Sequence, residues 1–579
     1  MKPSKTASSA SATPSTILWE LPYAVAVDKD YWEWKQKLCF SCLAPTAIAA
    51  TDFSCPACKQ ATYCSQACYS RDRDGVEGHM WECLAFQRVT ENRAGLNELR
   101  SDAHLRLVAR LVARISKDGG RQNSSEELSR SFERLLKTEN ETKSKAAGDQ
   151  DETKENTLLL SSESPRPQKT HEQTGGAMCR NFYDLMSHSE NLKKEGVWEA
   201  KWRKFQTYFA CIPDSPFASL SSSAFLEVYG RVRTNSFTLS GFFEPDQQPY
   251  FIGIGLYLQT SRFDHSCAPD LHVFFQNARL YLRPLVLPAN CLGPAATSIA
   301  AAPPVAVLDL SQDLRISYKC WRGTFASSHE RKEALNRSFH FICTCSRCTN
   351  EADDRTIWTG LRQECRSCKT PLVPSVAHPG ELTFCNPRCF LQPPLDSRSA
   401  LNCLHCGQAT AEDISLSDFM DALRNIIFVG LGLSSFDTLQ DISIYEQRLS
   451  KASQLLHPSK NGWIAIAYET FLDEYLEPRA ENSAGVGKTD SEKRKHSLTQ
   501  CVKYGRLLLD CYRLILANAS VDYPILCAKI GNWFEQLGDE DQATAWYKRA
   551  QSIWRQSWAA DHTCVKQLED KICKLVNVH

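Results

Sequence analysis

Cysteines and one histidine recur in closely spaced pairs near the N-terminal end of the chain. The pairs are Cys39-x-x-Cys42, Cys55-x-x-Cys58, Cys64-x-x-x-Cys68 and His79-x-x-x-Cys83. Thiolate and imidazole groups bind zinc, and four of them complete one tetrahedral site. Eight ligands therefore predict two zinc ions in residues 39–83. Because this stretch has few apolar side chains, we expect its folding to depend on the metal.

A polar segment at residues 264–267, Asp-His-Ser-Cys, lies between two apolar segments. Its groups are costly to bury unless each has a partner. A cluster of three thiolates, one fewer than tetrahedral zinc needs, follows at Cys343, Cys345 and Cys348. We predict Cys267 as the fourth ligand. The alternative is a buried free cysteine beside a structural histidine, and the nearby cluster favours the metal.

Six more cysteines occur between residues 365 and 406, which is more than one zinc ion requires. Cys365-x-x-Cys368 and Cys403-x-x-Cys406 have the regular spacing of zinc knuckles, so we predict them as the ligands. Cys385 and Cys389 are the alternative pair.

The composition limits the class of protein. The chain has 579 residues, too many for one hydrophobic core, so two or more domains are expected. Its formal net charge is zero, which provides no overall basic field to attract nucleic acid or an anionic membrane. It has no run of 18 apolar residues and no apolar signal-peptide core. We therefore expect an intracellular protein without a membrane segment, in which paired cysteines bind metal rather than form disulfides.

Residues 39–83 carry three basic residues against five acidic ones, and the thiolates add negative charge. Binding to duplex DNA depends on neutralising phosphates, so direct DNA binding is not expected here. Docking of a protein or peptide is the better interpretation.

The remaining sequence predicts the elements that position these groups. Residues 1–16 are rich in Ser, Ala, Thr and Pro and predict a disordered leader. Residues 17–38 fit a strand and a docking segment. Residues 138–178 contain no aromatic side chain and predict a disordered insertion. Residues 288–309, rich in Ala and Pro, predict a surface loop. From about Asp418 onward the pattern is helical.

Three helical patterns stand out. Apolar residues at helical spacing predict one amphipathic helix through Leu96, Leu99, Ala103, Leu107, Leu111 and Ile115. One helical face is predicted for Trp198, Trp202, Phe205 and Phe209. Small and aromatic residues between Gly531 and Ala550 resemble a tetratricopeptide (TPR) unit, whose stacked hairpins offer a concave binding face. A helical core without binding activity is the alternative.

Three segments carry a resemblance to a known family. They are Asp264-His-Ser-Cys267, Leu314-Arg-Ile-Ser-Tyr318 and Phe341-Ile-Cys-Thr-Cys-Ser-Arg-Cys348, and they resemble the SET domain with its cysteine-rich post-SET segment. The paired cysteines of residues 39–83, with Tyr63 directly before Cys64, resemble a MYND finger. In that finger the first and third pairs share one zinc ion, and the second and fourth share the other. The chain thus resembles the SET and MYND domain-containing (SMYD) lysine methyltransferases over roughly residues 17–410.

The resemblance implies an α+β fold: a split SET β-fold with an inserted MYND zinc finger, a post-SET zinc region and a C-terminal α-helical TPR-like domain. The implied boundaries are 17–38 for an N-terminal SET segment, 39–83 for the finger, 84–342 for the SET domain, 343–410 for the post-SET zinc region and 411–579 for the helical domain. The first glycine is Gly75, so the family's N-terminal glycine-rich loop is expected to be missing and the SET segment truncated.

The resemblance also implies S-adenosylmethionine-dependent methylation of lysine in histone or non-histone proteins. Tyr318 matches the tyrosine whose hydroxyl orients the lysine amine. The implied lysine channel is formed by Ser236, Phe237 and Phe339. The implied methyl-donor site is formed by His188, Asn235, Asp264, His265 and Phe341. Two positions depart from the family: Asp264 replaces a usual Asn, and Phe339 replaces a common Tyr.

A second function remains open from the sequence. The chain could be a catalytically weak or inactive scaffold that binds proteins through its finger and helical domain in transcriptional or chromatin regulation. In either case the expected partners are protein or peptide ligands, the expected oligomeric state is a monomer, and the resemblance implies a location in the nucleus and cytoplasm.

Overall fold

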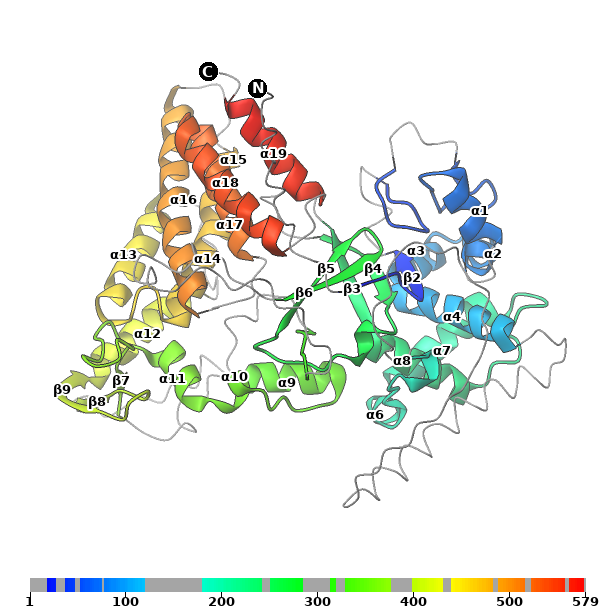
Figure 1. The fold of residues 1–579 in the computed structure, drawn as a ribbon, viewed down its shortest axis with the longest axis horizontal. Coiled ribbons are helices and arrows are strands. Elements are labelled where there is room, and N and C mark those ends of the chain that lie inside the picture. The colour runs from blue at the N-terminus through cyan, green and yellow to red at the C-terminus, as the bar shows by residue number, and fades with distance from the viewer. Residues whose placement is uncertain are drawn as a thin grey trace, which may run out of the picture.

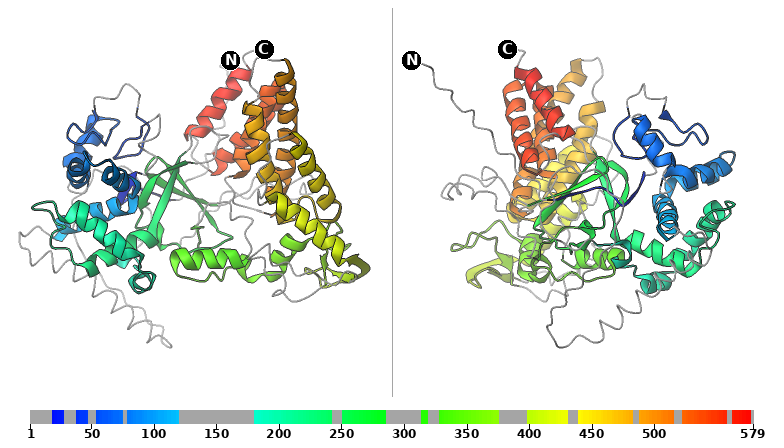
Figure 2. Two further views of the ribbon diagram at one scale, coloured as in Figure 1. Left: turned by 180° about the vertical axis from the view of Figure 1, so that it is seen from behind. Right: turned by 45° about the vertical axis from the view of Figure 1, so that its right-hand side comes forward.

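The computed structural model describes the chain in thirteen segments. These are residues 18–27, 37–46, 53–74, 78–119, 180–241, 250–284, 313–318, 328–375, 398–430, 439–482, 488–515, 522–557 and 562–576. The predicted leader at 1–16, the insertion at 138–178 and the loop at 288–309 lie outside them. Within these segments helices and strands are mixed, and central strands lie between an N-terminal helical part and a fan of C-terminal helices (Figure 1; Figure 2).

Two antiparallel sheets form the centre. In one sheet, β6 (Arg279–Pro284) pairs with both β1 (Leu18–Glu20) and β5 (Leu271–Gln276). In the other, β4 (Tyr250–Leu256) pairs with both β2 (Ala24–Val27) and β3 (Ser236–Gly241). Residues 18–27 thus add an edge strand to each sheet.

One glycine explains a close approach in the second sheet. Gly253 pairs with Val27, and a Cβ atom at Gly253 would lie 2.4 Å from the carbonyl oxygen of Ala26. That distance is far below van der Waals contact, so any larger residue would push β2 away from β4.

The amphipathic helix predicted around residues 96–115 is in fact two helices, α3 (Arg93–Ser101) and α4 (Ala103–Gly119). Asp102 separates them with a non-helical backbone, φ −108° and ψ 75°. Its carboxylate accepts the N–H of Leu105 at 3.0 Å and pairs with Lys201. Asp102 therefore caps the second helix. Its side chain competes with the helix carbonyls for backbone N–H groups, and the spacing of apolar residues does not reveal this.

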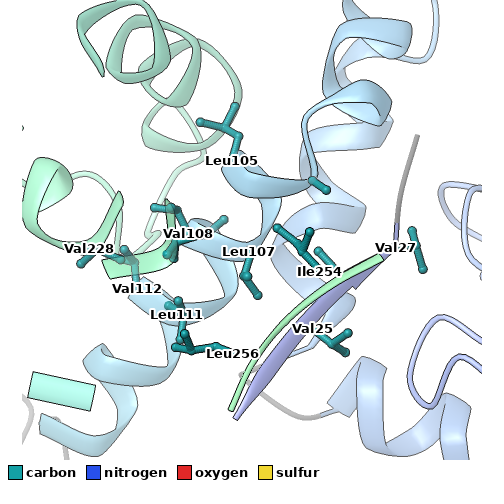
Figure 3. Close-up of a cluster of buried hydrophobic side chains, with 14 of the residues drawn as sticks. Val25, Val27, Leu105, Leu107, Val108, Leu111, Val112, Val228, Ile254 and Leu256 are labelled. Atoms are coloured by element: carbon teal, nitrogen blue, oxygen red, sulfur yellow. The ribbon is translucent and has the colours of Figure 1, made fainter. Parts of the chain in front are cut away.

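Helix α4 is central to the N-terminal core. It packs between β2 and α8 (Ser222–Asn235), and Figure 3 shows aliphatic side chains from these elements meeting. The labelled residues include Val25, Val27, Leu107, Leu111, Val112, Val228, Ile254 and Leu256, all buried.

The aromatic face predicted around residues 198–209 packs beside this core. It lies on α7 (Val197–Phe205) and the π-helical turn that follows, Gln206–Ala210. Phe205 contacts the rings of Trp202 and Phe209, with centroid distances of 6.1 and 5.3 Å. The short helix α6 (Ser189–Glu195) precedes it.

The segment that carries Tyr318 pairs with the polar segment 264–267 without forming a continuous strand. Within residues 313–318 the structure has isolated bridges, in which Ile316 pairs with His265 and Leu271. The N–H of Ser266 donates to the carbonyl of Ile316 at 2.9 Å, and the N–H of Ile316 donates to the carbonyl of Asp264 at 3.0 Å. The polar segment at 264–267 thus satisfies its backbone groups against the segment that carries Tyr318.

A cysteine-rich region links the centre to the C-terminal helices. Its elements are α9 (Ser328–Phe339), α10 (Ser346–Thr349), α11 (Glu351–Thr359), β7 (Val373–Pro374), β8 (Arg398–Asn402) and β9 (Ala409–Ser415).

The C-terminal region is helical, as predicted. Its helices are α12 (Leu416–Gly430), α13 (Leu439–Leu455), α14 (Gly462–Phe471), the π-helical turn η10 (Leu472–Leu476), α15 (Glu477–Asn482), α16 (Lys488–Ile515), α17 (Asp522–Leu537), α18 (Glu540–Ser557) and α19 (Thr563–Val576). Gly531 lets α17 and α18 approach, because its Cβ would lie 2.7 Å from the Tyr547 ring. Among the described helices, none combines the length and apolarity needed to cross a membrane.

The central sheet contacts this helical region directly. Phe274 of β5 belongs to the hydrophobic core of the C-terminal helices, and Tyr281 of β6 packs against that core. Arg283 donates to the carbonyl oxygen of Arg555 at 3.4 Å. The helices are therefore held at a defined position relative to the polar segment 264–267.

Candidate active site and metal centres

The paired ligands of residues 39–83 form two separate clusters. One contains Cys39, Cys42, Cys64 and Cys68, and the other contains Cys55, Cys58, His79 and Cys83. Within each cluster the ligand atoms all lie within 4.8 Å of one another. The pairs interleave as the resemblance implied, first with third and second with fourth.

Individual distances in these clusters match zinc geometry. Sγ of Cys64 lies 3.6 Å from Sγ of both Cys42 and Cys68. Sγ of Cys58 lies 3.1 Å from Nε2 of His79. Zn–S bonds of about 2.3 Å place tetrahedral sulfur ligands about 3.8 Å apart, so each cluster has room for one ion at its centre.

Two further clusters match the predicted third and fourth sites. Cys267 joins Cys343, Cys345 and Cys348, and its Sγ lies 3.5 Å from that of Cys348. The other cluster consists of Cys365, Cys368, Cys403 and Cys406. The alternative pair, Cys385 and Cys389, lies outside the described residues.

Buried charges fix the His79 cluster against α4. Oε2 of Glu82 lies 3.8 Å from Nδ1 of His79 and accepts from Arg110 at 2.6 Å. Arg110 also contacts Asp72 at 3.2 Å. At 3.8 Å the Glu82 carboxylate faces the His79 imidazole without a hydrogen bond, and its bonds to Arg110 join residues 39–83 to α4.

All nine residues predicted for the donor site and lysine channel line one cleft. Its volume is about 1230 Å³. They are His188, Asn235, Ser236, Phe237, Asp264, His265, Tyr318, Phe339 and Phe341. They come from the start of α6, the junction of α8 and β3, the polar segment 264–267, the segment ending at Tyr318, and the residues at and after the end of α9. Their individual roles stay predictions.

Tyr318 lies among aromatic rings in this cleft. Its ring centroid lies 5.1 Å from that of Phe339, 5.3 Å from that of His265 and 6.1 Å from that of Phe341. Its hydroxyl donates to the carbonyl oxygen of Phe263 at 2.9 Å. Burial, with the nearby carboxylate of Asp264, raises the pKa of Tyr318 to about 12, so the phenol is neutral at physiological pH.

His265 joins Tyr318 to the Cys267 cluster. Its Nδ1 accepts the backbone N–H of Tyr318 at 3.0 Å, and its Nε2 lies 3.2 Å from Sγ of Cys267. An accepting Nδ1 in a neutral imidazole places the proton on Nε2. The Nε2–H group can therefore donate to the Cys267 sulfur, which is an outer-shell contact typical of metal thiolates.

Asn235 and His188 are held by the backbone around them. The Asn235 amide donates to the carbonyl oxygens of Met186 and Arg231 at 2.8 and 2.9 Å, so its Nδ2 group is bonded to the backbone. His188 has a left-handed backbone, φ 50°, at the start of α6. Its ring lies 5.1 Å from that of His340.

The cleft also contains charged residues that sequence reasoning missed. Arg180 lines it and donates to the carbonyl oxygens of Ser261 and Asp184 at 2.6 and 3.0 Å. Glu469 of α14 and Asp522 of α17 line it from the C-terminal helices. Arg180 lies eight residues before His188, which the resemblance had marked. No local pattern points to Glu469 or Asp522, because only the packing of the helical region brings them here.

Known proteins with similar sequences are named as methyltransferases or as SET and MYND proteins. The human histone-lysine N-methyltransferase SMYD3 is 28% identical over 188 residues, 32% of this chain and 37% of that protein. A SET and MYND domain-containing protein of Dictyostelium discoideum is 25% identical over 343 residues, 58% of this chain and 55% of that protein. The zebrafish N-lysine methyltransferase SMYD2-B is 22% identical over 300 residues, 52% of this chain and 48% of that protein. No protein-family model matches the chain.

The match thus spans between about a third and about half of the length of these relatives. Together with the cysteine clusters and the mixed helix and strand fold, these similarities relate the chain to proteins that are named as lysine methyltransferases. More particularly, it is a relative of the SET and MYND domain-containing family that its motifs resemble.

Proposed function

We propose that the chain is a protein-lysine N-methyltransferase that uses S-adenosylmethionine, built on a split SET fold with a TPR-like helical region. One observation carries the proposal: the nine residues chosen from sequence, which span positions 188 to 341, line a single cleft. A chance selection over such a distance would scatter across the surface.

The proposed reaction is an in-line displacement. A neutral lysine nitrogen attacks the methyl carbon, a C–N bond forms as the C–S bond breaks, and the lysine proton leaves to solvent. Alignment of the two reactants is the main requirement. The neutral hydroxyl of Tyr318 can orient the amine, because at its raised pKa it remains a hydrogen-bonding group rather than an anion.

The aromatic rings beside Tyr318 favour the neutral amine. Phe339 packs against Tyr318, and Phe237 lines the same cleft. Ring faces exclude water from a lysine side chain, and desolvation lowers the pKa of an ammonium group. With Phe339 in place of a common tyrosine, the channel has one hydroxyl fewer, which leaves more room around a methylated nitrogen.

The same cleft fits the methyl donor. When bound, S-adenosylmethionine supplies an electrophilic methyl group on a positively charged sulfur. The residues that would hold it are His188, Asn235, Asp264, His265 and Phe341. A ring face such as that of Phe341 and the carboxylate of Asp264 both suit a cationic ligand.

Zinc fits all four cysteine-rich clusters, in a structural role. Each cluster supplies four thiolate or imidazole ligands. A catalytic zinc site keeps one position open, whereas four protein ligands close the coordination sphere. The Cys267 cluster would tie residues 343–348 to the polar segment 264–267, and thereby hold Phe339 and Phe341 beside Tyr318.

The substrate would be a lysine of a histone or another protein. Glu469 and Asp522 give the C-terminal wall of the cleft negative charge, which suits a basic segment around that lysine. The finger and the helical region are the proposed docking surfaces for further protein partners, and the proposed location is the nucleus and cytoplasm.

Two experiments test the proposal, first donor binding and then methyl transfer. Calorimetry with S-adenosylmethionine should give saturable binding, and labelled donor should transfer label to lysine in histones or an array of lysine peptides. Absence of binding at millimolar donor would contradict the enzyme function and leave the interaction scaffold as the better explanation.

A further inference from the structure

Arg180 is a half-buried cation that lines the proposed donor cleft. Two carbonyl oxygens, those of Ser261 and Asp184, hold its guanidinium in place. A guanidinium has five N–H donors, so these two bonds leave it able to bind a carboxylate as well. Within the described part of the chain, no carboxylate forms an ion pair with Arg180.

Asp264 lies in the same cleft and carries the opposite charge. Its side chain is exposed to the cleft, and its backbone carbonyl is fixed by the N–H of Ile316 at 3.0 Å. Its carboxylate, too, has no ion-pair partner among the described residues.

The two charges are close enough to influence each other. Burial lowers the pKa of Arg180, while the nearby Asp184, Tyr318 and Asp264 oppose that shift. Arg180 and Asp264 are therefore neighbours of Tyr318 without being bonded to each other. An anion and a cation that line the same cleft without pairing match a ligand that carries both charges on one carbon atom.

We propose that Asp264 and Arg180 bind the two ends of the amino-acid head of the methyl donor, Asp264 its α-ammonium group and Arg180 its α-carboxylate. This inference rests on the proposed function, because it assigns residues to that donor. It also gives a reason for the aspartate at position 264: a carboxylate there pairs with the ammonium, and Arg180 balances the added negative charge.

The test compares two ligands by calorimetry on the full-length, zinc-loaded chain. Decarboxylated S-adenosylmethionine keeps the sulfonium and the ammonium but lacks the carboxylate. The wild type should bind the intact donor about tenfold to a hundredfold more tightly, as expected for one charge-assisted hydrogen-bonded pair. This comparison needs no variant and so does not depend on how a substitution affects folding.

Variants then assign the preference to residues. Arg180→Met should lower the affinity for the intact donor by that same factor. Its affinity for the decarboxylated ligand should stay within about twofold of the wild-type value. Asp264→Asn should weaken both ligands alike, because both carry the ammonium. Arg262→Met is the matched control, because it removes another cation from the same cleft, an exposed one beside Phe263. It should change the affinities for the two ligands by the same factor and so keep the wild-type preference.

The outcomes separate the inference from the proposed function. If the wild type binds neither ligand, the proposed function fails and the inference fails with it. If the wild type binds both equally, or if Arg180→Met and Arg262→Met reduce the preference to the same extent, the donor site stands and the assignment of Arg180 is overturned.

Discussion

Nδ1 of His265 accepts the backbone N–H of Tyr318 at 3.0 Å. The other nitrogen of the same ring lies 3.2 Å from Sγ of Cys267. One imidazole therefore links the tyrosine proposed to orient the substrate amine to a ligand of the third metal cluster. Loss of metal at that cluster should disturb the cleft even though no ligand of the ion needs to touch the substrate.

Removing this imidazole should weaken the third metal site. His265→Ala deletes the outer-shell donor to the Cys267 sulfur, and such losses typically lower metal affinity about 10- to 100-fold. A chelator titration should therefore release one zinc ion earlier than in the wild type. His329→Ala, an exposed histidine on α9, is the control and should leave the titration unchanged. Identical titrations for wild type and His265→Ala would contradict the link.

Metal content tests the clusters themselves. We expect four zinc ions per chain in the wild type and three in Cys267→Ala, with the two ions of residues 39–83 retained because their ligands are independent of Cys267. The measurement is elemental analysis in reducing buffer. Cys573→Ala removes an exposed cysteine outside every cluster and should keep four. Two ions or fewer in the wild type would rule out the third and fourth sites.

The buried charges around Glu82 should be costly to disrupt. Glu82 accepts two bonds from Arg110, and both side chains are almost fully buried. Glu82→Gln leaves Arg110 with less negative charge in a buried site, so we expect a loss of about 3–5 kcal/mol in the free energy of unfolding. Denaturant unfolding at pH 7 measures it. Glu333→Gln, which breaks an exposed pair with Arg337, should cost less than about 1 kcal/mol.

The same pair predicts a pH dependence. Burial alone would raise the pKa of Glu82, but Arg110, His79 and Arg106 lower it to about 2. A depressed carboxyl pKa stabilises the fold above the ordinary value of 4.5, and that contribution is lost as pH falls from 4.5 toward 2. The stability difference between wild type and Glu82→Gln should therefore shrink over this range. A constant difference would contradict the assigned ion pair.

Ligand spacing made the metal clusters predictable from sequence. Tetrahedral zinc demands four soft ligands, and Cys-x-x-Cys pairs bring two of them together through local backbone geometry alone. Even Cys267, 76 residues from Cys343, could be assigned, because three thiolates leave one position to fill. The cleft residues were found through family resemblance, since no local rule marks Asn235 or Phe339 as lining a site.

Other features depend on packing that the sequence does not encode locally. Glu469 and Asp522 reach the cleft only because Phe274 and Tyr281 hold the sheet against the C-terminal helices. The break at Asp102 interrupts an apolar repeat that continues through both helices. The break is visible only in the structure, where the Asp102 carboxylate accepts the backbone N–H of Leu105. Such features arise from long-range contacts or from one polar side chain competing with helix hydrogen bonds.

The activity itself depends most directly on the hydroxyl of Tyr318. This group donates to the carbonyl oxygen of Phe263 at 2.9 Å, which fixes its position in the cleft. Tyr318→Phe keeps the ring contacts with Phe339 and Phe341 and removes only the group that would orient the amine. Misplacing a reacting group by about 1 Å can cost about 100-fold in rate, and we expect a loss of that order in methyl transfer. Donor binding by calorimetry should stay within about threefold of wild type, because the ring that lines the cleft remains.

The pH profile distinguishes orientation of the amine from general-base catalysis by Tyr318. With its pKa raised to about 12, Tyr318 stays protonated up to about pH 11, so the rate should rise with pH only because lysine loses its proton. Tyr318→Phe should lower the whole curve without changing its slope. Tyr281→Phe is the matched control. Tyr281 packs on Phe274 but does not itself line the cleft, so this variant should retain wild-type rates. Equal label incorporation by wild type and Tyr318→Phe would contradict the assignment of Tyr318 and with it the proposed catalytic site.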